Sequence, residues 1–451
     1  MNSIAARVVA AVGTAVCAAS CATACATTGS APGRGDIGDA IRSRTGGELR
    51  REAGPTPSLP PEVSLGALTR EDAVAVALWN SPSFEASLTA LGLARADLVE
   101  ARLLRNPILS LLFPAGPKQF EWTLQFPVEV FWQRPRRVAA ATLNARAVGE
   151  RLVYDGLTLV ADVRTAFIEA VAGERRVVLA AENATLARRI AGITDARLRA
   201  GDISDLDARA PRSDAAQVDA EYRSLGHERD MALLSLIARM GLDVPSAQVR
   251  LAFTTPAAAP GTATACGAPE ALVEDAAASR PDVRAAEIGI EAAARRLSWE
   301  RSRVVNLVAM LDANSRRDAR DELGPGINGE IPIFSRNQGA VTRASVEIER
   351  ASLDYMAIRA RVATEVRSAS VRLAQAQEAM RIWSTDIIPS LEIEQRQAEG
   401  AYQAGEVSLL TLLDSSRRLV QARIRNLAVE MDLQRAAVAL DRTVGRACAS
   451  V

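Results

Sequence analysis

A short stretch occurs twice in the chain, as "RAGDIS" at 199–204 and as "QAGEVS" at 403–408. Each copy interrupts a sequence that is otherwise typical of helix over more than a hundred residues. The same offset of 204 residues pairs further identical residues on the C-terminal side, such as Gly241 with Gly445. A break repeated at a fixed distance predicts two copies of one structural unit.

Both units have the same predicted order of elements. A helix (69–104 and 270–303) is followed by two short apolar segments, a long helix (136–199 and 337–403), the Gly break, and a return helix (205–241 and 408–445). A helix of about 64 residues would be roughly 95 Å long. The chain is 48% apolar but only 4% aromatic, which is typical of long packed helices. We therefore expect a rod.

The predicted divisions follow from these patterns. They are an export signal (1–25), a flexible segment (26–66), a first repeat (67–241), a linker rich in Pro, Gly and Thr (242–269), a second repeat (270–446) and a tail (447–451). The second return helix has one apolar stripe, which consists of Leu413, Val420, Ile424, Leu427, Met431 and Val438. Arg417, Arg425 and Arg435 lie off this stripe, and we expect them on a solvated face.

The N-terminus has one Arg and then an apolar stretch from 8 to 19 that is too short to span a bilayer, as in an export signal. Cys21 follows small residues as in a bacterial lipoprotein site, but Ala18 replaces the usual Leu, so lipidation and ordinary cleavage both stay open. Outside this leader only Cys266 and Cys448 occur, and we expect unpaired thiols rather than a disulfide.

The short apolar segments have the alternation of strands. In "QFEWTLQFPVEVF" the apolar Trp122, Leu124, Phe126 and Val128 alternate with polar residues, and "GINGEIPIF" alternates likewise through Ile331 and Ile333. A soluble hairpin packed on helices would show the same pattern. Each segment, however, has about the 9–11 residues that a transmembrane strand needs, and an exported chain without a spanning helix can cross lipid only as a closed barrel.

Four strands are too few for a barrel, since about eight are needed; a homotrimer would supply twelve. The expected fold is thus mainly α with a small β-barrel contribution.

The net charge of the chain is zero, so no nucleic-acid partner is indicated. One histidine, His227, and no phosphate-binding Gly loop leave no catalytic, cofactor or metal site. We predict that the protein is not an enzyme.

With these features the sequence resembles the outer-membrane efflux (TolC-like) family over about 66–446. The motifs are "LRAGDISDLD", "YQAGEVSLLTLLD" and "IPIFSRNQGA" at 331–340, and the last is similar to the heavy-metal (cobalt, zinc, cadmium) branch. The resemblance implies a passive, trimeric outer-membrane conduit that extends into the periplasm. Its implied partners are a periplasmic adaptor protein and an inner-membrane transporter of the RND type.

The resemblance also implies roles for single residues. The tips that contact the adaptor would be Gly201, Asp202, Ser204, Gly405, Glu406 and Ser408, and the pore gate would be Asp207, Tyr402 and Asp414. Thr411 stands where an acidic residue is common, which weakens a double acidic ring, and a helix-capping role is the alternative for each carboxylate. Pro211 should kink the first return helix. Two other functions stay open: a type I protein-secretion channel and a periplasmic coiled-coil scaffold.

Overall fold

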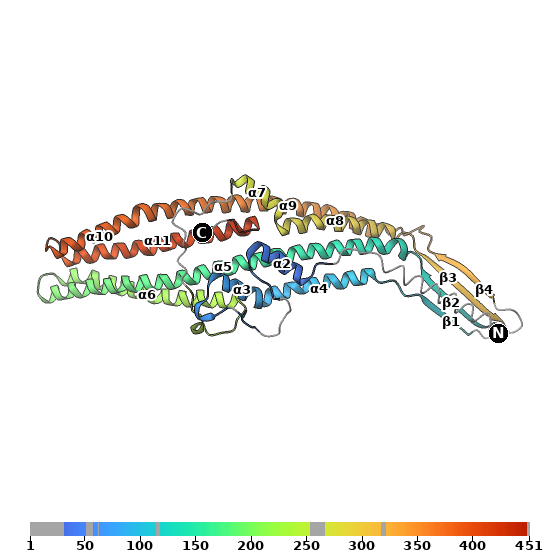
Figure 1. Ribbon diagram of the computed structural model, residues 1–451, viewed down its shortest axis with the longest axis horizontal. Helices are drawn as coiled ribbons and strands as arrows, with labels where there is room; N and C mark the ends of the chain where they lie inside the picture. The colour runs from blue at the N-terminus through green and yellow to red at the C-terminus, as the bar shows by residue number, and fades with distance from the viewer. Residues whose placement is uncertain are drawn as a thin grey trace.

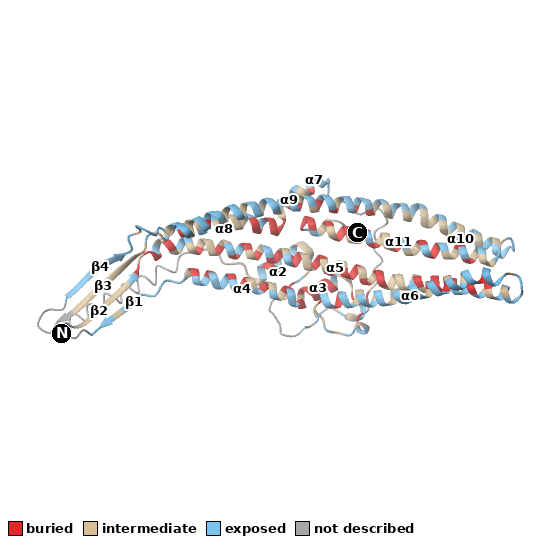
Figure 2. Ribbon diagram, turned by 180° about the vertical axis from the view of Figure 1, so that it is seen from behind, coloured by how far each residue is buried: buried red, intermediate tan, exposed pale blue. Residues whose placement is uncertain are grey.

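The computed structural model describes residues 31–50, 57–61, 63–113, 118–252, 267–316 and 322–448. They form a long rod with a small sheet at one end and two helical tips at the other (Figure 1). The prediction of a mainly helical chain with a small sheet is confirmed. Buried residues line the facing sides of the helices, whereas the sheet and the tips are mostly exposed or half-buried (Figure 2).

The first half of the chain begins with two short helices, which are separated by a 3₁₀ turn at Leu65–Ala67. Its elements are α2 (Arg34–Thr45), α3 (Arg70–Asn80), α4 (Pro82–Arg102), β1 (Ile108–Leu112), β2 (Lys118–Pro127), α5 (Val130–Arg199) and α6 (Asp205–Arg239). With 70 residues, α5 is about 105 Å long. Pro211 lies inside α6, which continues past it to Arg239.

The second half repeats the long elements in the same order. After a 3₁₀ turn at Ser246–Gln248 it comprises α7 (Pro269–Ser279), α8 (Pro281–Ser302), β3 (Leu307–Arg316), β4 (Glu322–Gly329), α9 (Gln338–Ile382), a π-helical segment (Trp383–Ile387), α10 (Ile388–Gln403) and α11 (Leu409–Val444). Pro82 and Pro281 open α4 and α8, because a first-turn proline gives up no helical hydrogen bond.

The apolar core runs along the helices rather than around one centre. One cluster joins α2 to α6 in the first half, and a second joins α7, α9 and α11. A third lies between the halves, where Ile168 of α5 meets Leu427 and Met431 of α11. The predicted stripe of α11 is buried except for Ile424, which is half-buried.

Helix α2 corrects the expectation of a flexible segment over 26–66. Its Ile37 and Ile41 are fully buried, and Ile41 packs where a Cβ on Gly156 of α5 would collide with it. Arg34 donates two hydrogen bonds to the Glu85 carboxylate of α4. Helix α2 therefore belongs to the first core, since a glycine in α5 lets it approach closely.

The cysteine expectations have different outcomes. Cys448 is disulfide-bonded, so the expectation that it stays unpaired is wrong. Cys266 and the predicted lipidation residue Cys21 lie outside the described residues.

Candidate functional site

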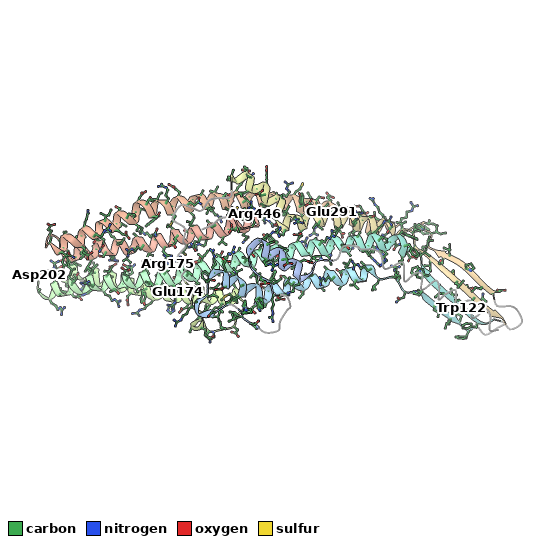
Figure 3. All side chains as sticks on the ribbon, viewed as in Figure 1. Trp122, Glu174, Arg175, Asp202, Glu291 and Arg446 are labelled. Atoms are coloured by element: carbon green, nitrogen blue, oxygen red, sulfur yellow. The ribbon has the colours of Figure 1, made fainter. Side chains whose placement is uncertain are left out.

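Two regions at opposite ends of the rod carry the predicted functional residues. Trp122 lies in the sheet and Asp202 lies at a helical tip, with the helices between them (Figure 3). The sheet is a single antiparallel layer in the order β1-β2-β3-β4. Its central pair, β2 with β3, joins the two halves of the chain.

The two tips have the same backbone geometry. Gly201 and Gly405 both adopt φ +79°, the left-handed conformation that favours glycine. The next N–H reaches back to close the helix end: Asp202 donates to the Arg197 carbonyl at 2.9 Å, and Glu406 donates to the Ala401 carbonyl at 2.8 Å. This is the Schellman pattern of a helix end. The predicted reversal at each Gly is confirmed.

A serine begins each return helix, as predicted, but the two caps differ. The Ser204 hydroxyl accepts the N–H of Asp207 at 3.2 Å and donates to the Asp207 carboxylate at 2.7 Å. The Ser204 backbone N–H also donates to the Asp207 carboxylate, at 3.3 Å. The hydrogen bonds that the Asp207 carboxylate accepts from the Ser204 side chain and then from its backbone lower the pKa of Asp207. In the second cap the Ser408 hydroxyl accepts the N–H of Thr411 at 3.2 Å. Thr411 thus completes a neutral cap where the first tip has a carboxylate.

The residues predicted for a gate lie close to the tips. The Tyr402 carbonyl accepts the Gly405 N–H at 3.0 Å, and 39% of the Tyr402 surface is exposed. Asp414 is exposed and lies 3.3 Å from Arg418, which also pairs with Glu394 at 3.0 Å. Asp207 lies in the first turn of α6, and Asp414 lies near the start of α11. The gate role of these residues stays a prediction.

Ion pairs join the first hairpin (α5 and α6) to α11, although no spacing in the sequence predicts them. Arg417 donates to both oxygens of Asp214, Arg435 pairs with Glu169, and Arg175 pairs with Glu430 at 2.8 Å. The expectation that Arg417 and Arg435 lie on a solvated face is thus wrong. Only the pairing of α11 with the first hairpin brings their partners within reach.

The strand register gives the sheet one apolar face. Rows of residues that lie directly opposite one another run across it: Leu109–Leu124–Leu311–Pro325, Leu111–Trp122–Ala313–Leu323 and Phe126–Ala309–Ile327. On the other face Thr123 donates to Asp312 at 2.7 Å. Because opposite residues of neighbouring strands share a face, the predicted alternation holds in register over all four strands.

Three residues predicted in strands lie outside them. β2 ends at Pro127, so Val128 falls in the turn before α5, although its N–H still donates to the Leu307 carbonyl at 2.8 Å. β4 ends at Gly329, which leaves Ile331 and Ile333 in the connection to α9. Pro332 between them has no N–H to donate, which disfavours a continued strand.

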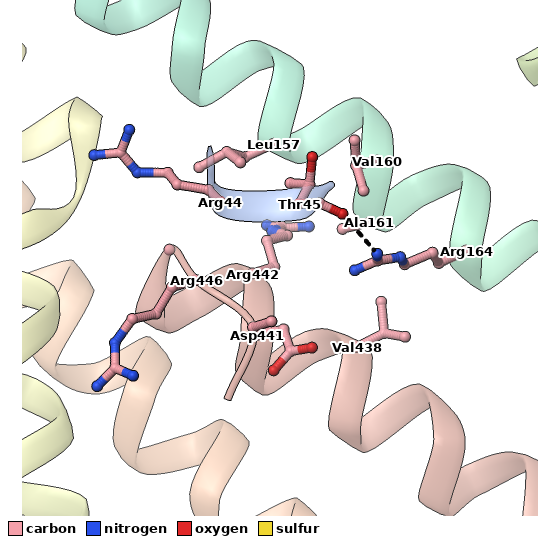
Figure 4. A pocket seen from close by; sticks show the side chains of 12 residues that line it. Arg44, Thr45, Leu157, Val160, Ala161, Arg164, Val438, Asp441, Arg442 and Arg446 are labelled. Carbon is pink, nitrogen blue, oxygen red and sulfur yellow. Dashed lines mark hydrogen bonds between the residues drawn. The ribbon is translucent and has the colours of Figure 1, made fainter. Parts of the chain in front are cut away.

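A small cavity lies between α2, α5 and the end of α11 (Figure 4). Its lining includes Arg44, Arg164, Arg442 and Arg446, and Arg164 donates to the Thr45 carbonyl at 3.4 Å. The volume of about 20 Å³ suits one or two water molecules rather than a solute.

Among the described residues, no group of three His, Cys, Asp or Glu side chains could hold a metal ion. No described helix is both long and apolar enough to span a bilayer.

Comparisons with known proteins show which proteins this chain is similar to. Residues 272–446 match the outer membrane efflux protein family. Over 391 residues the chain is 27% identical to the cobalt-zinc-cadmium resistance protein CzcC of Cupriavidus metallidurans. The aligned region covers 86% of this chain and 92% of CzcC. The second half of the chain thus contains a domain of the outer membrane efflux protein family.

Two further proteins are similar over most of the chain. The pyoverdine export outer membrane protein OpmQ of Pseudomonas putida is 24% identical over 72% of this chain and 70% of OpmQ. The crystal structure of a membrane protein from Pseudomonas aeruginosa has the same fold, with a TM-score of 0.69, 20% identity and coverage of 89% of this chain and 100% of that one. The chain is an outer-membrane efflux component that extends into the periplasm.

Proposed function

We propose that the protein is the channel of a tripartite efflux system. In this proposal three copies form one twelve-stranded barrel on a helical tunnel, and the tips dock on a periplasmic adaptor protein that connects to an inner-membrane transporter of the RND type. The channel is a passive conduit without catalytic activity or cofactor, and the energy for transport comes from the inner-membrane transporter.

The observation that carries the proposal is the sheet. It has one apolar face in register over four strands, and β1 and β4 are edges without a partner in the described chain. In lipid, unpaired N–H and C=O groups at such an edge are very costly. If β1 of one copy pairs with β4 of the next, both edges are satisfied and three copies close the barrel. A periplasmic scaffold would not need this apolar face.

The tips support the docking part of the proposal. The predicted contact residues are all exposed, namely Gly201, Asp202, Ser204, Gly405, Glu406 and Ser408. The backbones of both tips are fixed by the same turn. A rigid backbone that presents exposed side chains is a suitable contact surface for another protein. Similarity to CzcC supports heavy-metal cations as the cargo, whereas OpmQ is named for pyoverdine export.

The barrel is tested by replacing Trp122 with Arg. On the lipid face this change should cost roughly 2–4 kcal/mol near the bilayer midplane. Heat-sensitive trimer in isolated outer membranes should therefore fall, whereas Gln125→Arg on the opposite face should leave it nearly unchanged. Equal trimer levels in both variants would show that the face of Trp122 does not contact lipid. A soluble wild-type monomer would favour the alternative function of a periplasmic coiled-coil scaffold.

The cargo is tested in a strain that lacks the gene. Restoring the gene should restore growth in cobalt, zinc or cadmium if these cations are exported. Unchanged metal sensitivity with a protein missing from the medium would instead indicate a secretion channel.

A further inference from the structure

An open groove lies where the sheet meets the helices. Its volume is about 560 Å³, and its lining includes Arg105 from the first half of the chain with Arg303, Glu330 and Phe334 from the second. The groove therefore receives one guanidinium group from each half. Arg303 is oriented by Glu300 at 2.9 Å and lies over the Trp299 ring at 5.3 Å.

The surroundings of Arg105 carry an excess of positive charge. Residues 100–106 and 129–137 contain five arginines and two glutamates. One of these glutamates, Glu129, is only 3% exposed and lies 3.5 Å from Arg105. Burial, and then the nearby charges of Arg105 and Arg134, lower the pKa of Arg137, and Glu100 only partly opposes them. Arg137 itself donates to the Ala101 and Leu103 carbonyls, which holds it at the end of α4.

Exposed apolar side chains line the groove and occur nearby in the sequence. Phe334 lines the groove and is 92% exposed. Leu103, two residues before Arg105, is 59% exposed, and Phe131, two residues before the lining residue Gln133, is 69% exposed. The apolar face of the sheet begins on one side of the groove, and the charged helices begin on the other side. A surface with arginines beside exposed aromatic and aliphatic groups is suited to a molecule that has an anionic head and apolar chains.

We propose that this groove binds the phosphate of an anionic phospholipid headgroup between Arg105 and Arg303. The guanidinium groups donate paired hydrogen bonds to the phosphate oxygens, and the acyl chains lie along the apolar side chains toward the sheet. The inference rests on the proposed barrel, which puts the groove at the level of the inner-leaflet headgroups. Glu330 lines the groove and opposes the bound anion.

The test uses the detergent-purified full-length protein and native mass spectrometry. Wild type titrated with phosphatidylglycerol should retain it, and should retain phosphatidylcholine much less. The variant Arg105→Gln/Arg303→Gln should lose roughly tenfold in apparent affinity for phosphatidylglycerol, as expected for loss of charged hydrogen bonds. The control Arg209→Gln/Arg350→Gln removes two exposed arginines elsewhere, which pair with Asp205 and Asp354, and should bind as wild type does.

A variant of opposite sign separates lipid binding from loss of fold. Glu330→Gln removes a negative charge from the groove and should increase retention of phosphatidylglycerol at unchanged thermal stability of the trimer. Equal retention by wild type and the Arg105→Gln/Arg303→Gln variant, equal retention of the two lipids, or full displacement by an equimolar amount of inorganic phosphate would each overturn the proposal. So would a trimer that takes up no lipid because a neighbouring copy fills the groove. Fractionation separates the two proposals, since a protein found in the outer membrane without bound lipid contradicts only the lipid site.

Discussion

The two hairpins share their turns but differ in the long helix that leads to each turn. In the first hairpin α5 runs without interruption from Val130 to Arg199. In the second, α9 gives way at Trp383 to five π-helical residues, and Pro389 opens α10. Because π-helical turns break the regular hydrogen-bond ladder, the second hairpin has a built-in irregularity about one third of the way from its tip to the sheet.

The hairpins also differ in what holds their distal halves. Near the first tip, small side chains of α5 and α6 are buried against each other, among them Ala184, Ala187 and Ala191. At the matching positions α10 has no buried residue. Its contacts with α11 include exposed ion pairs, Arg423 with Glu392 at 3.3 Å and Arg418 with Glu394 at 3.0 Å. Such pairs contribute little to stability, so the second distal half depends more on neighbours outside this hairpin.

The largest effect should come from a buried charge in the first hairpin. Ala184 is fully buried, and Ala184→Asp places a carboxylate without a partner between α5 and α6. We expect a loss of about 3 kcal/mol or more in unfolding free energy. The matched change Ile388→Asp, 204 residues later at a half-buried position, should cost less than about half of that. Thermal unfolding of both variants measures the difference, and equal losses would contradict it.

Hydrogen exchange should show the same contrast without a mutation. Backbone amides at 384–403 should exchange roughly tenfold faster than those at 180–199, because fewer apolar contacts resist local opening there. The measurement is made on the detergent-solubilised protein with peptides from both regions. Comparable protection of the two regions would contradict the contrast. It would show that neighbouring copies protect the distal half of the second hairpin to the same extent that buried alanines protect that of the first.

Local residue chemistry was enough to predict the tips and most of the strands. A left-handed glycine and a capping serine determine each turn within six residues, and the alternation from Trp122 to Phe126 determines a strand face. The resemblance to the efflux family followed from the same short motifs, and the family match confirms it.

Features that depend on distant contacts could not be predicted in this way. Helix α2 is rich in Gly and Arg, and its burial depends on Gly156 more than a hundred residues later. The ion pair of Arg417 with Asp214 depends on which helices lie side by side. The π-helical segment lies within the sequence "IWSTDIIPS", in which only the proline indicates a break in the helix.

Strain at the turns should affect the two hairpins equally. A Cβ at Gly201 or Gly405 would meet no other atom, so substitution is opposed only by the positive φ, at a cost of about 1–2 kcal/mol. Gly405→Val and Gly201→Val should both weaken binding of the adaptor protein while trimers still form. Pull-down of the adaptor measures this, and unchanged binding in both variants would make each break an ordinary helix end.

Acid should distinguish the two caps. Since the pKa of Asp207 is lowered in the folded chain, its contribution is present above the ordinary Asp pKa of about 4 and is lost as the pH falls through the lowered value. The second cap uses Thr411, which does not titrate. Hydrogen exchange at 204–212 should therefore rise in acid more than at 408–416, after correction for intrinsic rates. Asp207→Asn should abolish that difference, and an unchanged difference in this variant would assign it to other groups.

The smallest effect on stability, with a measurable effect on current, should come from Asp414. Its carboxylate pairs with Arg418 four residues later on the same exposed face, and such a pair is worth about 0.3–0.5 kcal/mol. In the proposed trimer three copies of Asp414 surround one axis, where their field favours cations and is only partly screened over about 8 Å. Asp414→Ala should therefore lower cation preference and block by divalent cations in planar-bilayer conductance, even though Arg418 can still pair with Glu394. The control Asp202→Ala, at the outer tip, should reduce adaptor binding more than it changes the current. Identical selectivity in wild type and Asp414→Ala would remove Asp414 from the pore and leave it as one half of a surface ion pair.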